Sequence, residues 1–313
     1  MNTSHKRGMA GAGAAMSLVG TLTAVSATIS GYPVFGGQAA RYAVAALVLL
    51  AVARLAGGPA RRPSVRDWLL LAALAATGLV AFNVCIVLAT RDTSPATIGT
   101  VIATVPIVLA VVGPLMDGRR PAPAIIAAAC VVAAGAALAN GLGGGGARGL
   151  LLSLGALAGE VGFSLLAVPL LPRLGPLRVS AYSAALAVPM LLAVGLVADG
   201  TALLRVPTPG ELAGFAYLSI VVTTIAFLLW YDAIGRLGAD RAGLCAGLIP
   251  ISAVVTTVAL GIDRPQPADL AGAALVAAGV VVGLRARVAP RGPAPAEPVI
   301  CEAAPIGIAR GSA

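Results

Sequence analysis

The chain has 313 residues, of which 59% are hydrophobic and only 11% are charged. Soluble domains carry about a quarter charged residues, so this composition excludes nearly every soluble globular fold and favours a protein embedded in the lipid bilayer. The net charge of +9 does not indicate a nucleic-acid partner, because the basic residues are spread along the chain rather than gathered with stacking aromatic side chains.

Ten apolar windows follow one another along the chain, and each is close to the roughly 20 residues that a spanning helix needs. Their side chains are continuously apolar rather than alternating, which favours helices over barrel strands. The fold class predicted is an all-α integral membrane protein, with nine spans as an alternative because the tenth window is short. The windows are Met9–Ile29, Phe35–Ala53, Trp68–Ala89, Ala96–Met116, Ala122–Asn140, Gly149–Val168, Val179–Val197, Leu212–Trp230, Ala242–Leu260 and Ala268–Leu284.

The distribution of basic residues predicts the orientation of these spans. With ten spans and the N-terminus inside, only Arg91, Arg148, Arg205 and Arg264 fall in outer loops, and Arg41 falls inside the second span. The remaining Lys and Arg residues lie on the inner side, as the positive-inside rule requires. We therefore expect a multi-pass protein of the cell membrane with both termini in the cytoplasm.

Two segments of the chain form an internal repeat. Ser94–Val112 and Gly238–Thr256 match when shifted by 144 residues, and this shift places Pro106 opposite Pro250. Each half then has five spans, and because five is odd the two copies enter the membrane from opposite sides. Both prolines remove a backbone hydrogen bond in mid-span, which predicts either a helix break at a cavity or a simple kink.

The repeat divides the chain into five parts. Residues 1–8 are expected to form a cytoplasmic tail, 9–140 the first five-helix repeat, 141–148 a Gly-rich outer connector, 149–285 the second five-helix repeat, and 286–313 a Pro-rich disordered cytoplasmic tail. These bounds predict two inverted five-helix repeats in one membrane domain.

Two longer motifs resemble a known family. Pro33–Leu50, PVFGGQAARYAVAALVLL, and Phe227–Pro250, FLLWYDAIGRLGADRAGLCAGLIP, are similar to signatures in the two halves of EamA-type transporters of the drug/metabolite transporter superfamily. The resemblance covers about residues 12 to 285. It implies a secondary transporter, and it implies export as the direction of transport.

Glu160 is the acidic residue that the windows place in the middle of a span. The surrounding segment Leu154–Leu166, LGALAGEVGFSLL, resembles the first helix of small multidrug resistance transporters, which implies that Glu160 binds protons and cationic substrates in turn. An acid at the centre of a spanning helix costs about 2.5 to 3.5 kcal/mol, so it persists with a partner or a function. The alternative is that Glu160 is permanently paired with Arg41 or with hydroxyls such as those of Ser164, Thr21 and Thr23.

Other polar residues inside spans are candidates for substrate or proton binding. Arg41 lies close enough to the outer end of its span to extend to the headgroups; if it points inward instead, it can hold a substrate carboxylate. Asn83 and Thr23 are candidates to line a cavity, although hydroxyls in spanning helices also bond their own helix four residues back. We expect the aromatic residues near span ends, Trp230 and Tyr231 among them, to form an interfacial belt.

Glycine pairs four residues apart indicate close helix packing. Gly279 and Gly283 in the last window suggest either a packing seam or a homodimer face. The sequence lacks a Walker-type lysine, HExxH, GxSxG and any metal-ligand spacing, so we expect no enzyme activity, no cofactor and no metal.

The function predicted is export of small metabolites or cationic compounds, driven by protons through alternating access. An alternative is an amino-acid or other metabolite transporter without proton coupling. An alternative of another class is a structural or sensory membrane protein that transports nothing.

Overall fold

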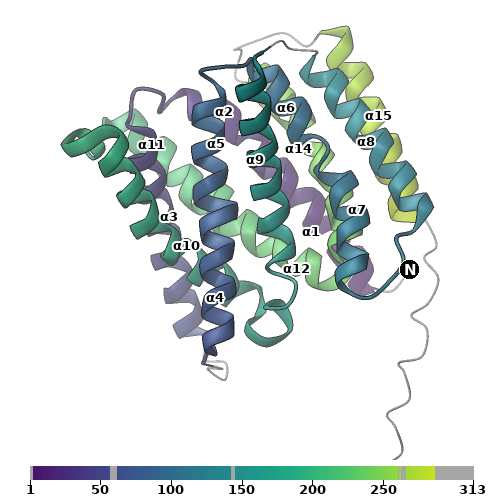
Figure 1. The fold of residues 1–313 in the computed structure, drawn as a ribbon, viewed down its shortest axis with the longest axis horizontal. Helices are drawn as coiled ribbons and strands as arrows, with labels where there is room; N and C mark the ends of the chain where they lie inside the picture. Colours follow the sequence, from purple (N-terminus) through teal and green to yellow (C-terminus); the bar gives the residue numbers. More distant parts are fainter. Residues whose placement is uncertain (1–2, 57–61, 142–144, 260, 262–265, 286–313) are drawn as a thin grey trace, which may run out of the picture.

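A computed structural model describes residues 3–56, 62–141, 145–259, 261 and 266–285, and these residues form a bundle of helices (Figure 1). An isolated β-bridge joins Thr93 to Gly145. The α-helices are α1 Thr3–Gly20, α2 Leu22–Ala27, α3 Val34–Leu55, α4 Val65–Leu74, α5 Phe82–Ala89, α6 Pro95–Ile102, α7 Val105–Met116, α8 Pro123–Asn140, α9 Ala147–Leu165, α10 Leu171–Asp199, α11 Pro209–Tyr217, α12 Ala226–Leu237, α13 Ala239–Leu244, α14 Leu248–Ala259 and α15 Pro267–Arg285.

Short segments of other helix types join several of these helices. Ala75–Ala81 and Leu218–Ile225 are π-helical, and Gly200–Leu203 and Cys245–Gly247 are 3₁₀-helical. Within the part of the chain described above, 9 helical segments are long and apolar enough to cross a membrane. The helix α8 is also apolar, but its described part, Pro123–Ala139, is shorter than these nine segments. The count of ten spans therefore stays a prediction.

The outer surface of the bundle is apolar, as expected for a protein whose solvent is lipid. Large aliphatic side chains face outward, including Leu47, Leu151, Val197 and Val282, each more than half exposed. A soluble monomer rarely exposes so much apolar surface, whereas helices in a bilayer turn such residues toward the acyl chains. The exposed faces and the buried core are therefore both apolar.

Several observed boundaries differ from the expected ones. The first helix begins at Thr3, so residues 3–8 are helical and continue into the first span rather than forming a separate tail. The helix α9 begins at Ala147, inside the predicted connector 141–148. Residues 142–144 of that connector and the predicted tail 286–313 lie outside the described residues.

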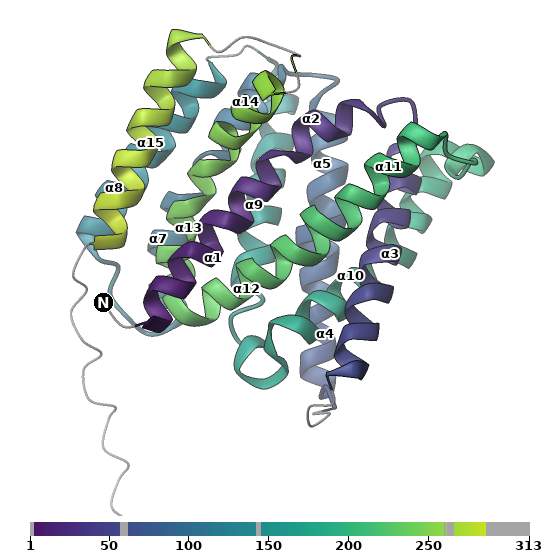
Figure 2. The same ribbon diagram turned by 180° about the vertical axis from the view of Figure 1, so that it is seen from behind.

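The two halves of the chain share irregular features at equivalent positions. A shift of 144 residues moves the first π-helical segment, Ala75–Ala81, onto residues 219–225, within the second π-helical segment. The same shift moves the break between α6 and α7 onto the break between α13 and α14. The halves pack against each other through α1 and α12, which lie side by side in Figure 2.

Two glycines of the last helix, Gly279 and Gly283, pack against another helix of the same chain. A β-carbon at Gly279 would meet the backbone of Ala128 and Val132, and one at Gly283 would meet Ala128, so both lie against α8. Figures 1 and 2 show α8 and α15 running alongside each other. This part of α15 is therefore an internal packing seam and is not free to receive a second copy of the chain.

Candidate functional site

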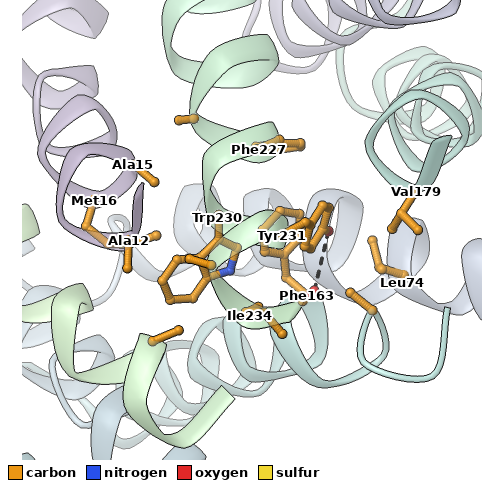
Figure 3. Packing of buried hydrophobic residues seen from close by; sticks show 14 of the residues in the cluster. Ala12, Ala15, Met16, Leu74, Phe163, Val179, Phe227, Trp230, Tyr231 and Ile234 are labelled. Carbon is orange, nitrogen blue, oxygen red and sulfur yellow. Dashed lines mark hydrogen bonds between the residues drawn. The ribbon is translucent and has the colours of Figure 1, made fainter. Parts of the chain in front are cut away.

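Aromatic rings from three helices meet at the centre of the bundle. Phe163 of α9 packs 4.8 Å from Phe227 and 5.0 Å from Tyr231 of α12, measured between ring centroids. Tyr42 of α3 joins this cluster through Phe227, at 6.4 Å. Figure 3 shows Phe163, Phe227 and Tyr231 near one another, with the Tyr231 hydroxyl directed at the Phe163 carbonyl oxygen 3.4 Å away, and the rings are tilted rather than stacked. The cluster thus joins α3 of the first half to α9 and α12 of the second.

Glu160 lies one helical turn before Phe163 and is half-buried beside this aromatic cluster. Tyr42 of α3 and Tyr231 of α12 lie within electrostatic range of its carboxyl group. Among the described residues, no ion pair or hydrogen bond involves the Glu160 side chain. The carboxyl group thus lies within electrostatic range of side chains from both halves and has no basic partner in the described structure.

The hydroxyls considered as partners for Glu160 are engaged elsewhere. Ser164 accepts a hydrogen bond from the Trp230 indole at 3.3 Å, and Thr21 bonds to the Tyr217 hydroxyl at 2.9 Å. The ion pairs of the described chain do not join Arg41 to Glu160. The side chain of Thr23 lies outside the described part of the structure.

Arg41 points into the bundle rather than toward the headgroups. Its side chain is only 5% exposed, and its Nε donates to Thr223 Oγ1 at 2.6 Å while its Nη1 donates to Gln38 Oε1 at 3.3 Å. The guanidinium also lies over the Tyr42 ring, 5.4 Å from the ring centroid. Both hydrogen-bond acceptors are neutral, so the buried positive charge has no carboxylate beside it in the described structure.

A small cavity lies next to Arg41. It has a volume of about 110 Å³ and is lined by Arg41 and Gln38 together with Ser26, Tyr32 and Phe215. Planar guanidinium groups recognise carboxylates with two parallel hydrogen bonds. The arrangement is therefore chemically suited to hold a small carboxylate.

Asn83 makes a contact within its own helix. Its side-chain amide donates to the Leu79 carbonyl oxygen at 2.5 Å, and it also interacts with the Tyr42 hydroxyl. Asn83 thus lies near the central cluster, and it contacts Tyr42 without contacting Glu160 directly.

The two repeat prolines follow real breaks in their spans. Pro106 is the second residue of α7, just after the break from α6, and Pro250 is the third residue of α14, just after a 3₁₀ turn. Neither proline belongs to the lining of the small cavity near Arg41 or of the larger cavity described next. Their predicted role at a cavity stays a prediction.

A larger cavity reaches the face of the bundle at which α1 begins, hereafter the N-terminal face. Its volume is about 850 Å³, and its lining includes Asp117, Arg119, Asp232 and Asp240. Tyr231 also lines this cavity. Of the α12 residues in the lining, Tyr231 lies furthest from the N-terminal face. This cavity and Glu160 therefore share Tyr231 as a neighbour.

Sequence reasoning missed the two tyrosines of this site. Trp230 and Tyr231 were expected in an interfacial belt, but they are 2% and 0% exposed, so that interpretation is wrong for both. The helix α12 continues to Leu237, beyond the expected end of the span at Trp230. Tyr42 and Gln38 were not singled out, although their spacing from Arg41 by one and three residues places them near it on α3.

Comparison with known proteins fits a helical membrane transporter with two related halves. The model of the EamA-like transporter family matches residues 7–141 and again residues 147–285. The chain belongs to the EamA-like transporter family. Its two halves are two copies of that family's repeat, and a role in transport rather than catalysis or passive structure follows from this membership.

Two named relatives match most of the chain. A probable terminal-alkyne amino-acid exporter of Streptantibioticus cattleyicolor is 30% identical over 278 residues, covering 83% of this chain and 86% of the relative. An uncharacterized transporter, YetK, of Bacillus subtilis is 24% identical over 282 residues, covering 86% and 84% respectively. A solved crystal structure has a TM-score of 0.74 at 21% identity, covering 88% of this chain and 95% of that one, which shows the shared fold.

Proposed function

We propose that this protein is a proton-coupled secondary transporter of the cell membrane that exports small metabolites bearing a cationic amino group, amino acids among them. The observation that carries the proposal is Glu160, a carboxyl group in the middle of a span that has no ion-pair partner in the described structure and lies within electrostatic range of Tyr42 and Tyr231. Charged groups in this position are costly, and they are characteristic of proton and substrate pathways.

In the proposed mechanism, protons and the substrate's ammonium group bind to the same carboxyl group at different times. The ionised Glu160 binds the ammonium group from the cytoplasm, the two halves rearrange, and a proton from outside replaces the substrate. The protonated site then returns and releases its proton inside. Because the two ligands exclude each other, each cycle exchanges one for the other, and the proton gradient drives export.

Arg41 supplies a second contact in the proposed site. Its buried guanidinium beside the 110 Å³ cavity is suited to the carboxylate of an amino acid, while Glu160 is suited to the ammonium group. The name of the relative from Streptantibioticus cattleyicolor supports amino acids as the substrate class. Asn83 is proposed to orient Tyr42 between the two charged groups, and Thr23 stays a candidate from the sequence.

The proposed orientation places the N-terminal face in the cytoplasm. The support is the excess of Lys and Arg in the loops on that side. In this orientation the 850 Å³ cavity opens to the cytoplasm, where an exporter takes up its substrate.

The test is a thermal-stability screen of the purified protein against organic cations, amino acids and neutral metabolites at pH 6 and pH 8. A ligand of the folded state raises the melting temperature by mass action. We expect amino-bearing ligands to stabilise the wild type more at pH 8 than at pH 6, because protons compete for Glu160. The E160Q variant should lose this pH dependence, whereas D199N, which removes an exposed carboxyl group at the end of α10 outside the lining of both cavities, should keep it.

Transport into proteoliposomes completes the test. An imposed proton gradient should drive counter-transport by the wild type and by D199N but not by E160Q. If E160Q transports with an unchanged pH profile, proton coupling at Glu160 is refuted. If amino acids stabilise wild type and E160Q alike, the second candidate, a metabolite transporter without proton coupling that binds through Arg41, replaces the first.

A further inference from the structure

Two capping boxes occupy equivalent positions in the two halves. Ser64 and Asp67 begin α4, and Thr208 and Glu211 begin α11, exactly one repeat of 144 residues later. In each box the carboxylate accepts a backbone hydrogen bond from the cap residue, at 2.8 Å in both cases. Because the halves are inverted, Asp67 lies at the N-terminal face and Glu211 at the opposite face.

Glu211 is part of a tight connection between the halves at the opposite face. Both of its carboxylate oxygens bind the Arg205 guanidinium, which also donates to the Gly31 carbonyl oxygen at 3.2 Å. The Arg205 guanidinium lies 4.9 Å from the centroid of the Tyr32 ring, and the Tyr32 hydroxyl donates to the Arg205 carbonyl oxygen at 2.7 Å. Gly31, Tyr32, Arg205 and Glu211 form what we call the opposite-face latch.

Asp67 makes the equivalent but looser connection at the N-terminal face. Its carboxylate binds Arg173, which lies in the short helical segment of α10 before the kink at Gly175, with 3.1 Å between Oδ1 and Nη1, and the Arg173 side chain is 50% exposed. Asp67 and Arg173 form the N-terminal-face latch. Asp67 and Glu211 each lie at the start of the third span of their own half. Asp67 binds Arg173 directly, and Glu211 is connected to Gly31 through Arg205. In both cases the connection reaches the region between the first and second spans of the other half.

The two faces differ in how closed they are. The 850 Å³ cavity reaches the N-terminal face, and Leu171 and Pro172, the neighbours of Arg173, line it. Near the opposite-face latch the cavity is only about 110 Å³. The face with the denser latch is therefore the closed one, and the face with the single ion pair is the open one.

We propose that Arg205 is a gating residue for transport: its contacts in the opposite-face latch hold that face closed in the described structure, whereas the Asp67–Arg173 pair is formed at a face that is already open and does not close it. This inference rests on alternating access, which is part of the proposed function, but it does not depend on Glu160 or on the identity of the substrate. An ion pair that forms in one of the two states stabilises that state, and it thereby shifts the equilibrium between the two states toward it.

Arginine variants test this without disturbing the capping boxes. R205Q and R173Q remove the cross-links but leave Asp67 and Glu211 to cap their helices. R91Q at the opposite face and R54Q at the N-terminal face are matched controls, because both arginines are exposed and neither contributes to an ion pair in the described structure. Each change is made in a cysteine-free full-length chain that carries one reporter cysteine.

The reporters lie in the two cavities. S26C lies in the lining of the small cavity at the opposite face, and V168C lies in the lining of the large cavity. The measurement is the labelling rate with a hydrophilic thiol reagent in detergent, without substrate. R205Q should raise the rate at S26C and lower it at V168C, each by about two- to fivefold, as expected for a partly exposed ion pair. R205Q should change both rates more than R173Q, because Arg173 makes one half-exposed ion pair at a face that the large cavity already opens, and both controls should leave the rates unchanged.

Faster labelling at both S26C and V168C in R205Q would overturn the proposal, because it indicates general loosening of the bundle. A change at one reporter without the reciprocal change at the other would also overturn it. Because no proton gradient or substrate is used, a negative result here leaves the role of Glu160 standing, and E160Q failing in transport leaves the latches standing.

Discussion

Arg41 and Thr223 connect the two halves of the protein by a 2.6 Å hydrogen bond from the guanidinium Nε to the threonine hydroxyl oxygen. Thr223 lies in the second π-helical segment, and its own hydroxyl donates to Leu218 O, five residues back. The wider turn thus orients the oxygen that holds the buried guanidinium. The π-helical segment therefore helps to position Arg41, the residue proposed to bind a carboxylate.

Replacing Thr223 by valine should destabilise the protein. The change removes the acceptor for a buried charged donor, which costs about 1 to 3 kcal/mol when nothing replaces it. Thr224 is a matched control, because it lies in the same turn and bonds to Ser219 O at 2.9 Å without contacting Arg41. Thermal unfolding in detergent should show a larger loss for T223V than for T224V. Equal losses would mean that the Arg41 contact contributes nothing specific.

Gly36 should not tolerate a side chain. A β-carbon there would collide with the backbone carbonyl of Leu203, which cannot move aside as a flexible side chain does. We expect G36A to lower stability by about 1 to 3 kcal/mol, the typical cost of overpacking. Its control is G13A, where the nearest atom to the added carbon is Leu248 Cδ1 at 3.7 Å, an ordinary contact. If G36A unfolds at the same temperature as G13A, the close approach of α3 to the 3₁₀ segment is refuted.

The two tryptophans should report different environments. Trp68 is 42% exposed on the outer surface, whereas Trp230 is 2% exposed and donates to Ser164 at 3.3 Å. In liposomes that contain brominated lipid, the fluorescence of W230F, which retains Trp68, should be quenched strongly. The fluorescence of W68F, which retains Trp230, should be quenched weakly. Equal quenching in the two variants would show that Trp230 faces lipid and that the central packing in Figure 3 is wrong.

The spans and the repeat were predictable because long apolar runs have few alternatives in a bilayer. The helix breaks before Pro106 and Pro250 were also foreseeable, since proline lacks the backbone donor that a continuous helix needs. The unusual position of Glu160 was visible because a lone acid in an apolar run stands out by composition alone. These signals are local, and a single sequence carries them.

The neighbours of Glu160 were not predictable in the same way. Tyr231 was placed at a membrane interface because Asp232 and Arg236 follow it and suggest a loop. In the structure the helix continues through both residues. Their side chains lie one helical turn apart and form an ion pair, with 2.6 Å between Arg236 Nε and Asp232 Oδ2. Tyr42 reaches the site from α3 across the two halves, and such contacts depend on tertiary packing rather than on periodicity.

The paired π-helical segments also bear on the origin of the chain. Backbone hydrogen bonds in a π-helical turn join residues five apart, whereas those in an α-helical turn join residues four apart. Inserting a single residue into an α-helix therefore produces a π-helical turn and leaves the flanking helix unchanged. Both halves have this irregularity at the same position of their third span. One insertion that preceded the duplication of an ancestral five-helix gene accounts for both, whereas a later origin requires the same event twice.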